Sequence, residues 1–255
     1  MTLLVVDIGN TLTKVGIWDG VRIGLVVQRP SGEAGDFIAD VAKMAGAHSA
    51  EAAPLAVCAV VPAAFQVWAE WAEAEGRPLL RIQGDTETPL ANRYRAPETL
   101  GPDRLAAAVA AEHRLGAPVI VASAGTAVVV DAVSPKREYL GGAIWVGTRL
   151  GFRALAEGTK GLPPISLEDV STPIGGDTAA SLRAGALHGT AALIEGLTTR
   201  MREYLGADAP MTLTGGDADR ISPYLRIAHE LFPTLTLEGL ALIWEHARGQ
   251  SHADR

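Results

Sequence analysis

A short apolar run that ends in a glycine turn occurs twice in this chain, and this repeat limits the folds available to it. The first copy, residues 5–11, reads Val-Val-Asp-Ile-Gly-Asn-Thr, and the second, residues 121–126, reads Val-Ala-Ser-Ala-Gly-Thr. Apolar runs of this length between turn residues are typical of buried strands. A further strand pattern follows each glycine, at residues 13–17 and 127–133. The repeat therefore indicates an internal duplication.

The remaining patterns alternate between strands and helices, which predicts an α/β protein. The chain has no low-complexity linker, so we expect two half-domains, residues 1–115 and 116–255, packed around a cleft. The further predicted strands are 3–6, 23–27, 55–61, 79–82, 119–121 and 211–213, and the predicted helices are 33–45, 63–75, 102–115, 178–204 and 237–248.

Composition excludes several classes of protein. The 255 residues are 48% hydrophobic and 20% charged, which is ordinary for a globular chain. A net charge of −7 disfavours binding to nucleic acid or to an anionic membrane, but a small anionic substrate needs only a few local cations. The single cysteine, Cys58, has no partner for an internal disulfide. The N-terminus shows no leader pattern and no stretch is long and apolar enough for a membrane span, so we expect a soluble, cytoplasmic protein with no membrane partner.

The first glycine turn carries the residue types that bind phosphate. Gly9 allows backbone N–H groups to approach an anion, and Asp7 at the strand end suits a hydrated Mg²⁺. The alternative is a hairpin whose Asp and Asn only satisfy the turn. The candidate phosphate-binding residues are Asp7, Gly9, Asn10, Thr11, Thr13 and Lys14.

Two later turns strengthen the phosphate-binding interpretation. Gly125 and Thr126 form the counterpart of the first turn in the second half and give a second phosphate-type turn; Thr126 is a nucleotide contact only as the family resemblance described below implies. Gly215 and Gly216 follow a strand and suit a base or ribose lying over bare backbone. Together the three turns match the duplicated nucleotide-binding fold of the actin, hexokinase and Hsp70 type, which is ribonuclease H-like.

A separate motif, Gly101-Pro102-Asp103-Arg104, stands at the start of a predicted helix. A carboxylate and a guanidinium at a helix N-terminus offer a base and an anion clamp together. The alternative is that Asp103 only interacts with the helix dipole while Arg104 faces solvent.

Taken in order, the motifs resemble those of type III pantothenate kinases along nearly the whole chain. The matching segments are Asp7-x-Gly9-Asn10-Thr11, Gly101-x-Asp103-Arg104, Gly125-Thr126-Ala127 with Asp131, Gly141-Gly142-Ala143-Ile144, Leu162-Pro163, Gly176-Asp177-Thr178 and Leu213-Thr214-Gly215-Gly216.

This resemblance implies a two-domain fold of the acetate-and-sugar-kinase type, a homodimer, and ATP-dependent phosphorylation of pantothenate, the first step towards coenzyme A. It implies Mg²⁺ and a monovalent cation, K⁺ or NH₄⁺, as cofactors. Asp103 would then be the base for the pantothenate hydroxyl. The implied substrate contacts are Tyr94, Gly101, Pro102, Asp103, Arg104 and Thr178.

Ser123 departs from the family pattern, because family members place an aspartate three residues before the threonine of the second turn. That aspartate is a ligand of the monovalent cation in the family, and a serine removes its negative charge. Two outcomes follow: an enzyme with little dependence on K⁺, or a member that has lost efficient catalysis.

Three function classes stay open on these residues. The leading one is a pantothenate kinase. The second is a non-catalytic or regulatory paralogue, which Ser123 keeps open, and the third is a kinase of the same fold with another acceptor. Tyr94 and the motif from Gly101 to Arg104 argue against the third class.

Overall fold

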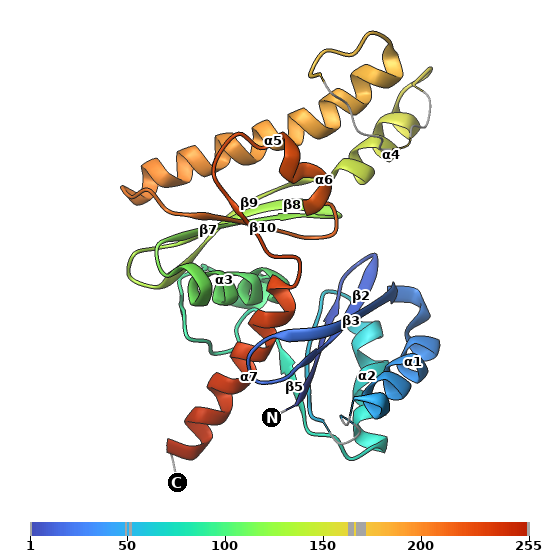
Figure 1. Ribbon diagram of the computed structural model, residues 1–255, viewed down its shortest axis with the longest axis vertical. Helices are drawn as coiled ribbons and strands as arrows, with labels where there is room; N and C mark the ends of the chain where they lie inside the picture. The colour runs from blue at the N-terminus through green and yellow to red at the C-terminus, as the bar shows by residue number, and fades with distance from the viewer. Residues whose placement is uncertain (1, 49, 51–52, 163–165, 167–171, 254–255) are drawn as a thin grey trace. The chain divides into compact units, whose positions relative to one another are not determined.

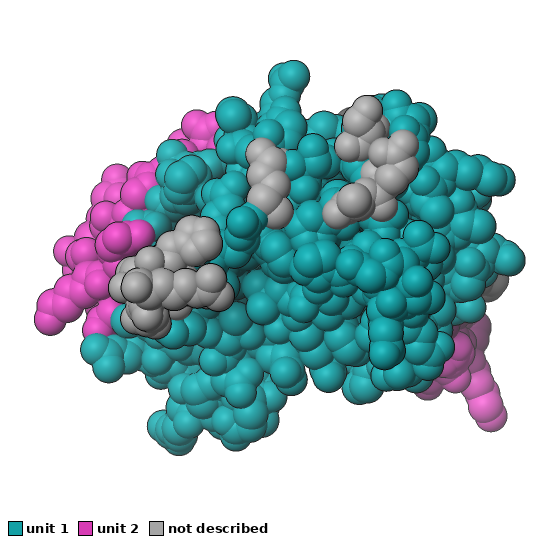
Figure 2. Space-filling model, turned by 90° about the horizontal axis from the view of Figure 1, so that it is seen from below, with its two compact units in different colours: residues 1–114, 234–255 teal, residues 115–233 magenta. Residues whose placement is uncertain are grey.

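The chain folds into two compact units. The computed structural model describes residues 2–48, 50, 53–162, 166 and 172–253. Unit 1 contains residues 1–114 and 234–255, and unit 2 contains residues 115–233; Figure 2 colours them separately. Residues 234–255, expected in the C-terminal half, belong to unit 1, because their helix packs against the strands of that unit.

Unit 1 is built on a five-stranded sheet with the order β3-β2-β1-β4-β5. The central strand β1 pairs antiparallel with β2 and parallel with β4, β2 pairs antiparallel with β3, and β4 pairs parallel with β5. The strands are β1 (Leu3–Ile8), β2 (Leu12–Trp18), β3 (Ile23–Pro30), β4 (Leu55–Ala59) and β5 (Leu79–Ile82).

Helices cover both faces of this sheet (Figure 1). On one face α1 (Ala34–Ala47) and α2 (Pro62–Ala74) enclose a core that includes Phe37 and Trp68, whose rings meet edge to face at 5.9 Å. On the other face α7 (Leu235–Ala253) packs against β1, β2 and β4. Unit 1 also contains α3 (Pro102–Leu115), η1 (Ser31–Glu33), η2 (Pro97–Thr99) and the short β6 (Ala91–Asn92).

Unit 2 repeats the topology of unit 1. Its strands lie in the order β9-β8-β7-β10-β11, in which β7 pairs antiparallel with β8 and parallel with β10. The outer pairs also match, since β8 and β9 are antiparallel while β10 and β11 are parallel. The strands are β7 (Val119–Ala124), β8 (Ala127–Val133), β9 (Glu138–Val146), β10 (Met211–Thr214) and β11 (Glu230–Leu231).

The long helix α5 (Thr178–Leu205) lies along the sheet of unit 2 (Figure 1). It begins at Asp177, whose side chain accepts a hydrogen bond of 2.8 Å from the Ala180 amide, and ends at Gly206 in the left-handed conformation. Its buried residues join those of β7, β8 and β10 in one core. The other helices of the unit are α4 (Thr148–Gly158), α6 (Ala218–Ile221) and η3 (Ser222–Tyr224).

The duplication extends to the burial of single residues. Strands β1 and β7 share one pattern, in which every residue is buried except the fifth, which is half-buried. That fifth residue is Asp7 in β1 and Ser123 in β7. Strands β2 and β8 share a pattern as well. The predicted duplication is therefore confirmed, and Ser123 is the structural counterpart of Asp7.

Most of the predicted elements are present, with boundary shifts. The strand predicted at 55–61 ends at Ala59, because the turn that leads into α2 begins there. The sequence analysis did not predict β9, α4, α6 or β11. In β9 Gly141 and Gly142 interrupt the apolar pattern, and Gly142 has no room for a side chain, since a Cβ would lie 1.9 Å from the Val130 oxygen.

The crossing of α3 and α7 in unit 1 depends on Gly239. A Cβ there would lie 1.8 Å from the Ala106 oxygen, so Gly239→Ala must push the helices apart. We expect a loss of about 1–3 kcal/mol in the free energy of unfolding, measured by denaturant titration. Gly249→Ala in the same helix is the control, because its Cβ meets open space and alanine favours helix. Equal effects of the two substitutions would contradict this view of the crossing.

Candidate functional site

The first glycine turn of unit 1 is held by a short chain of hydrogen bonds. The Gly9 amide donates to the Leu12 oxygen at 3.0 Å, which closes the turn between β1 and β2. The Thr13 hydroxyl, 1% exposed, donates to Ser31 Oγ at 3.1 Å, and Ser31 donates in turn to the Gly9 oxygen at 2.7 Å. Thr13 therefore supports the turn from within, which differs from the ligand contact expected of it, whereas Asn10 and Thr11 at the tip are exposed.

Asp7 lies at the end of β1 in an environment that disfavours its charge. It pairs in register with Lys14 of β2 and Cys58 of β4, and the Cys58 thiol donates to Asp7 Oδ1 at 3.4 Å. Burial and, after it, the charge of Asp103 raise the pKa of Asp7 from 3.8 to about 6, while the thiol and Lys14 act to lower it. Burial likewise raises the pKa of Cys58, so the thiol stays protonated.

The motif from Gly101 to Arg104 stands at the start of α3, as predicted. Pro102 is buried in the first turn and Asp103 follows, half-buried. A Cβ on Gly101 would lie 2.6 Å from Asp103 Oδ1, so the glycine makes room for this carboxylate. Arg104 is 8% exposed, and its guanidinium carbon lies 5.6 Å from the centre of the Tyr94 ring. The alternative in which Arg104 faces solvent is wrong.

Asp7 and Asp103 are thus close enough for one carboxylate to raise the pKa of the other. Two carboxylates with Lys14 nearby can hold a hydrated cation and accept a proton from a bound hydroxyl. No three His, Cys, Asp or Glu side chains within the described ranges gather as metal ligands.

Unit 2 carries the second glycine turn and its neighbours. The Gly125 amide donates to the Ala127 oxygen at 3.0 Å, and the Gly147 amide donates to the Thr126 oxygen at 3.1 Å. Gly215 has φ of +103°, and a Cβ on it would lie 2.3 Å from the Ala124 oxygen. Only glycine fits this close approach of β10 to the turn. Thr126 and Gly216 are exposed at the ends of their loops.

The remaining predicted site residues of unit 2 lie in different parts of it. Ser123 occupies the half-buried position at the end of β7, in register with Thr214 of β10 and Val129 of β8. Its single neutral oxygen does not supply the carboxylate that the family resemblance implies for a monovalent cation. Thr178 is exposed at the first position of α5, next to the capping Asp177.

Three residues at these sites were not found by sequence reasoning. Cys58 lies in the core, and the sequence does not link it to Asp7, since the two meet only when β4 pairs with β1. Ser31, which follows β3, contacts Gly9, and no pattern in the neighbouring sequence indicates this contact. Asp217, directly after Gly216, binds Thr148, Arg149 and Arg220; its place after the paired glycines was the available signal.

Comparison with known proteins gives the family. A model described as type III pantothenate kinase matches residues 3–200. A type III pantothenate kinase from Moorella thermoacetica is 34% identical over 250 residues, covering 95% of this chain and 98% of the relative. One from Myxococcus xanthus is 32% identical over 259 residues, covering 98% and 99%. The chain belongs to the type III pantothenate kinase family.

Solved structures support the predicted fold class. Component A of (R)-2-hydroxyglutaryl-CoA dehydratase from Acidaminococcus fermentans has a TM-score of 0.55 at 16% identity, covering 97% of this chain and 99% of that one. A ROK hexokinase from Thermus thermophilus has a TM-score of 0.50 at 15% identity, covering 97% and 100%. The type III pantothenate kinase fold of this chain is thus the duplicated, actin-like α/β fold.

Two further observations bear on the expectations for this family member. None of the helices in the described part of the chain combines the length and apolar character needed to cross a membrane. The motif segment Leu162-Pro163 lies partly outside the described residues, at Pro163.

The raised pKa of Asp7 predicts how the stability of the nucleotide-free protein depends on pH. The folded state binds this proton up to about pH 6 and the unfolded state only to about 3.8, so stability falls as the pH rises between these values. Above pH 6 the ionised carboxylate destabilises the fold by about 1–3 kcal/mol. Asp7→Asn should therefore raise Tm at pH 8 and have little effect at pH 4.

Asp19→Asn is the matched control for this measurement. Backbone hydrogen bonds from Arg22 and Val21 lower the pKa of the exposed Asp19, so its replacement should not raise Tm at pH 8. A Tm for Asp7→Asn that equals the wild type at both pH values would show that Asp7 is not strained by burial.

Proposed function

We propose that this chain transfers the γ-phosphate of ATP to the primary hydroxyl of pantothenate, the first step towards coenzyme A. The observation that carries the proposal is the proximity of Asp7 and Asp103, the two carboxylates that the family resemblance assigns to the nucleotide and to the acceptor. Family membership over nearly the full chain supports the same reaction. Because ATP is the donor, we infer a cytoplasmic location.

Phosphoryl transfer requires positioning and charge neutralisation more than covalent chemistry. The half-buried Asp103 orients the acceptor hydroxyl and accepts its proton. Arg104 pairs with the pantothenate carboxylate, and the Tyr94 ring beneath the guanidinium fixes its direction. Thr178 is a further substrate contact, with Gly101 and Pro102 shaping the start of α3.

The nucleotide is bound by turn residues and a cation. Asp7 would hold a hydrated Mg²⁺, which would supply positive charge to neutralise the phosphates. Lys14 and the backbone at Gly9, Asn10 and Thr11 bind phosphate oxygens, with Thr13 supporting the turn. Thr126, Gly215 and Gly216 are the nucleotide contacts of unit 2.

An ADP-release assay with pantothenate tests this proposal. Asp103→Asn should lower kcat by about 10²–10⁴-fold, because it removes the general base, with ATP binding retained. Glu98→Gln, an exposed acid just before the motif, should leave kcat unchanged.

Since Ser123 provides no charge for a monovalent cation, replacing K⁺ with Na⁺ should change the rate little. Wild-type protein without pantothenate-dependent turnover would refute the kinase, and strong K⁺ activation would refute the role given to Ser123.

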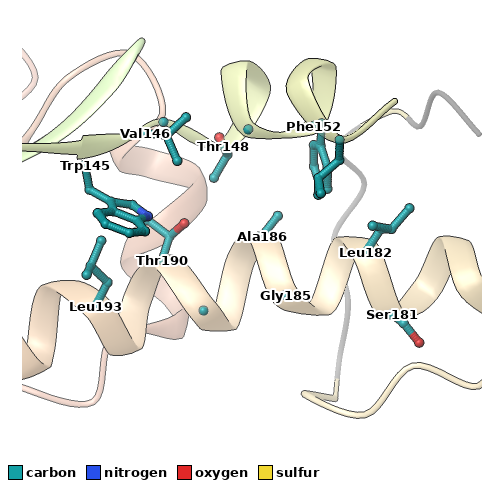
Figure 3. A pocket seen from close by; sticks show the side chains of 14 residues that line it. Trp145, Val146, Thr148, Phe152, Ser181, Leu182, Gly185, Ala186, Thr190 and Leu193 are labelled. Atoms are coloured by element: carbon teal, nitrogen blue, oxygen red, sulfur yellow. The ribbon is translucent and has the colours of Figure 1, made fainter. Parts of the chain in front are cut away.

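We further propose that the enzyme is a homodimer, as its family resemblance implies, and that an apolar surface of unit 2 takes part. A cavity of about 430 Å³ lies between the end of β9, α4 and α5. Figure 3 shows Trp145 beside Thr190 and Leu193, and Phe152 pointing from α4 towards α5. Several apolar side chains that line it are exposed, with Trp145 60%, Leu155 43% and Val146 41% exposed. Exposed apolar side chains gathered in this way are typical of a protein interface.

Trp145→Glu tests the dimer by placing a charge in this surface. We expect dissociation to monomers, measured by light scattering after gel filtration, because burying an unpaired carboxylate costs several kcal/mol. Val21→Glu, at a position 81% exposed in unit 1, should leave the dimer intact. A wild-type protein that is monomeric at micromolar concentration would rule out the dimer.

A further inference from the structure

Asp217 is a buried carboxylate that joins two segments of unit 2, its own loop after β10 and the start of α4. It directly follows Gly215 and Gly216, and its side chain is 7% exposed. It accepts hydrogen bonds from the Thr148 hydroxyl at 3.4 Å, Arg149 Nη2 at 3.3 Å and Arg220 Nη1 at 3.3 Å. A buried carboxylate is tolerated only where donors of this kind surround it. The loop after β10 is therefore fastened to the start of α4.

The backbone of the same segments encloses the second glycine turn. The Asp217 amide donates to the Ala124 oxygen at 2.9 Å, and the Gly147 amide donates to the Thr126 oxygen at 3.1 Å. A Cβ on Gly147 would lie 2.0 Å from the Gly125 oxygen, so these backbones touch. The side chain of Asp217 thus links the two segments that hold the turn on its two sides.

The charges of this cluster do not cancel. One carboxylate faces two guanidinium groups, so these three side chains together carry a net positive charge, on segments whose backbone is hydrogen-bonded to the second glycine turn at Ala124 and Thr126. Arg149 keeps 69% of its side chain exposed, whereas Arg220 keeps 33%. An arginine that is anchored through one nitrogen and otherwise open to solvent can still form two charge-assisted hydrogen bonds to a phosphate.

We propose that Asp217 is a positioning residue that holds Arg149 beside Gly125 and Thr126, where the guanidinium binds the polyphosphate of the nucleotide. This rests on the proposed function, which places ATP at that turn. Arg149 then contacts substrate directly, and Asp217 acts through it. Asp217 also fixes the spacing between the turn and Gly215 and Gly216.

The experiment measures the dissociation constants of ATP with Mg²⁺ and of adenosine for the full chain by calorimetry. Arg149→Ala should weaken ATP binding about tenfold, the loss of a charge-assisted hydrogen bond, and leave adenosine binding unchanged. Asp217→Asn should also weaken ATP more than adenosine. Because Asp217 acts through Arg149, the double variant should bind ATP no more weakly than the weaker single variant.

Arg153→Ala, one turn further along α4 and exposed, is the matched control and should bind both ligands as the wild type does. Arg149 is exposed, so its variant folds even if Asp217→Asn does not. Wild-type affinity for ATP in Arg149→Ala, or equal losses for ATP and adenosine, would overturn this inference alone. A wild-type protein that binds no ATP would overturn the proposed function and this inference with it.

Discussion

The desolvation of Asp7 at the end of β1 is the constraint on which the site of unit 1 depends. The strand lies at the centre of a sheet covered by helices on both faces, so its residues are buried up to the point where the chain turns at Gly9. A carboxylate at that point loses hydration and meets the charge of Asp103, which raises its pKa to about 6. Such a pair is unfavourable alone and becomes favourable when a cation or a transferred proton relieves it. The ionised carboxylate of Asp7 therefore destabilises the fold, although the proposed chemistry requires it.

Unit 2 has the same strand-end geometry but carries different side chains there. Ser123 replaces Asp7 at the half-buried position, and Thr214 replaces Cys58 as its neighbour on the parallel strand. Unit 2 thus has no desolvated carboxylate at the end of its central strand. One of its buried carboxylates is Asp217, one loop away, and there two arginines and a threonine compensate the charge. The two units share their backbone turns but carry their charged side chains at different positions.

The sequence was sufficient to predict what depends on neighbours along the chain. The strand–turn repeat, the α3 start at Pro102 and the α5 start at Thr178 follow from apolar periods, proline and capping residues. Contacts across strands were not predictable, because the pairing of β4 with β1 brings Cys58 to Asp7 over a separation of 51 residues. The burial of Thr13 shows the same limit. A hydroxyl beside a phosphate-type turn is expected to contact the ligand, and only the packing of β3 behind it shows that this side chain is buried.

The net charge of −7 describes the whole chain and says little about these two turns. A cationic side chain stands beside a carboxylate in each unit: Lys14 is the cross-strand neighbour of Asp7 in the hairpin, and Arg149 donates to Asp217, which we propose holds it at the second turn. Fixing a cation with a neighbouring carboxylate lowers the local positive charge, yet it removes the conformational entropy that a flexible lysine or arginine loses on binding. An acidic protein can therefore bind polyanions with few cations when those cations are held in place before the ligand arrives.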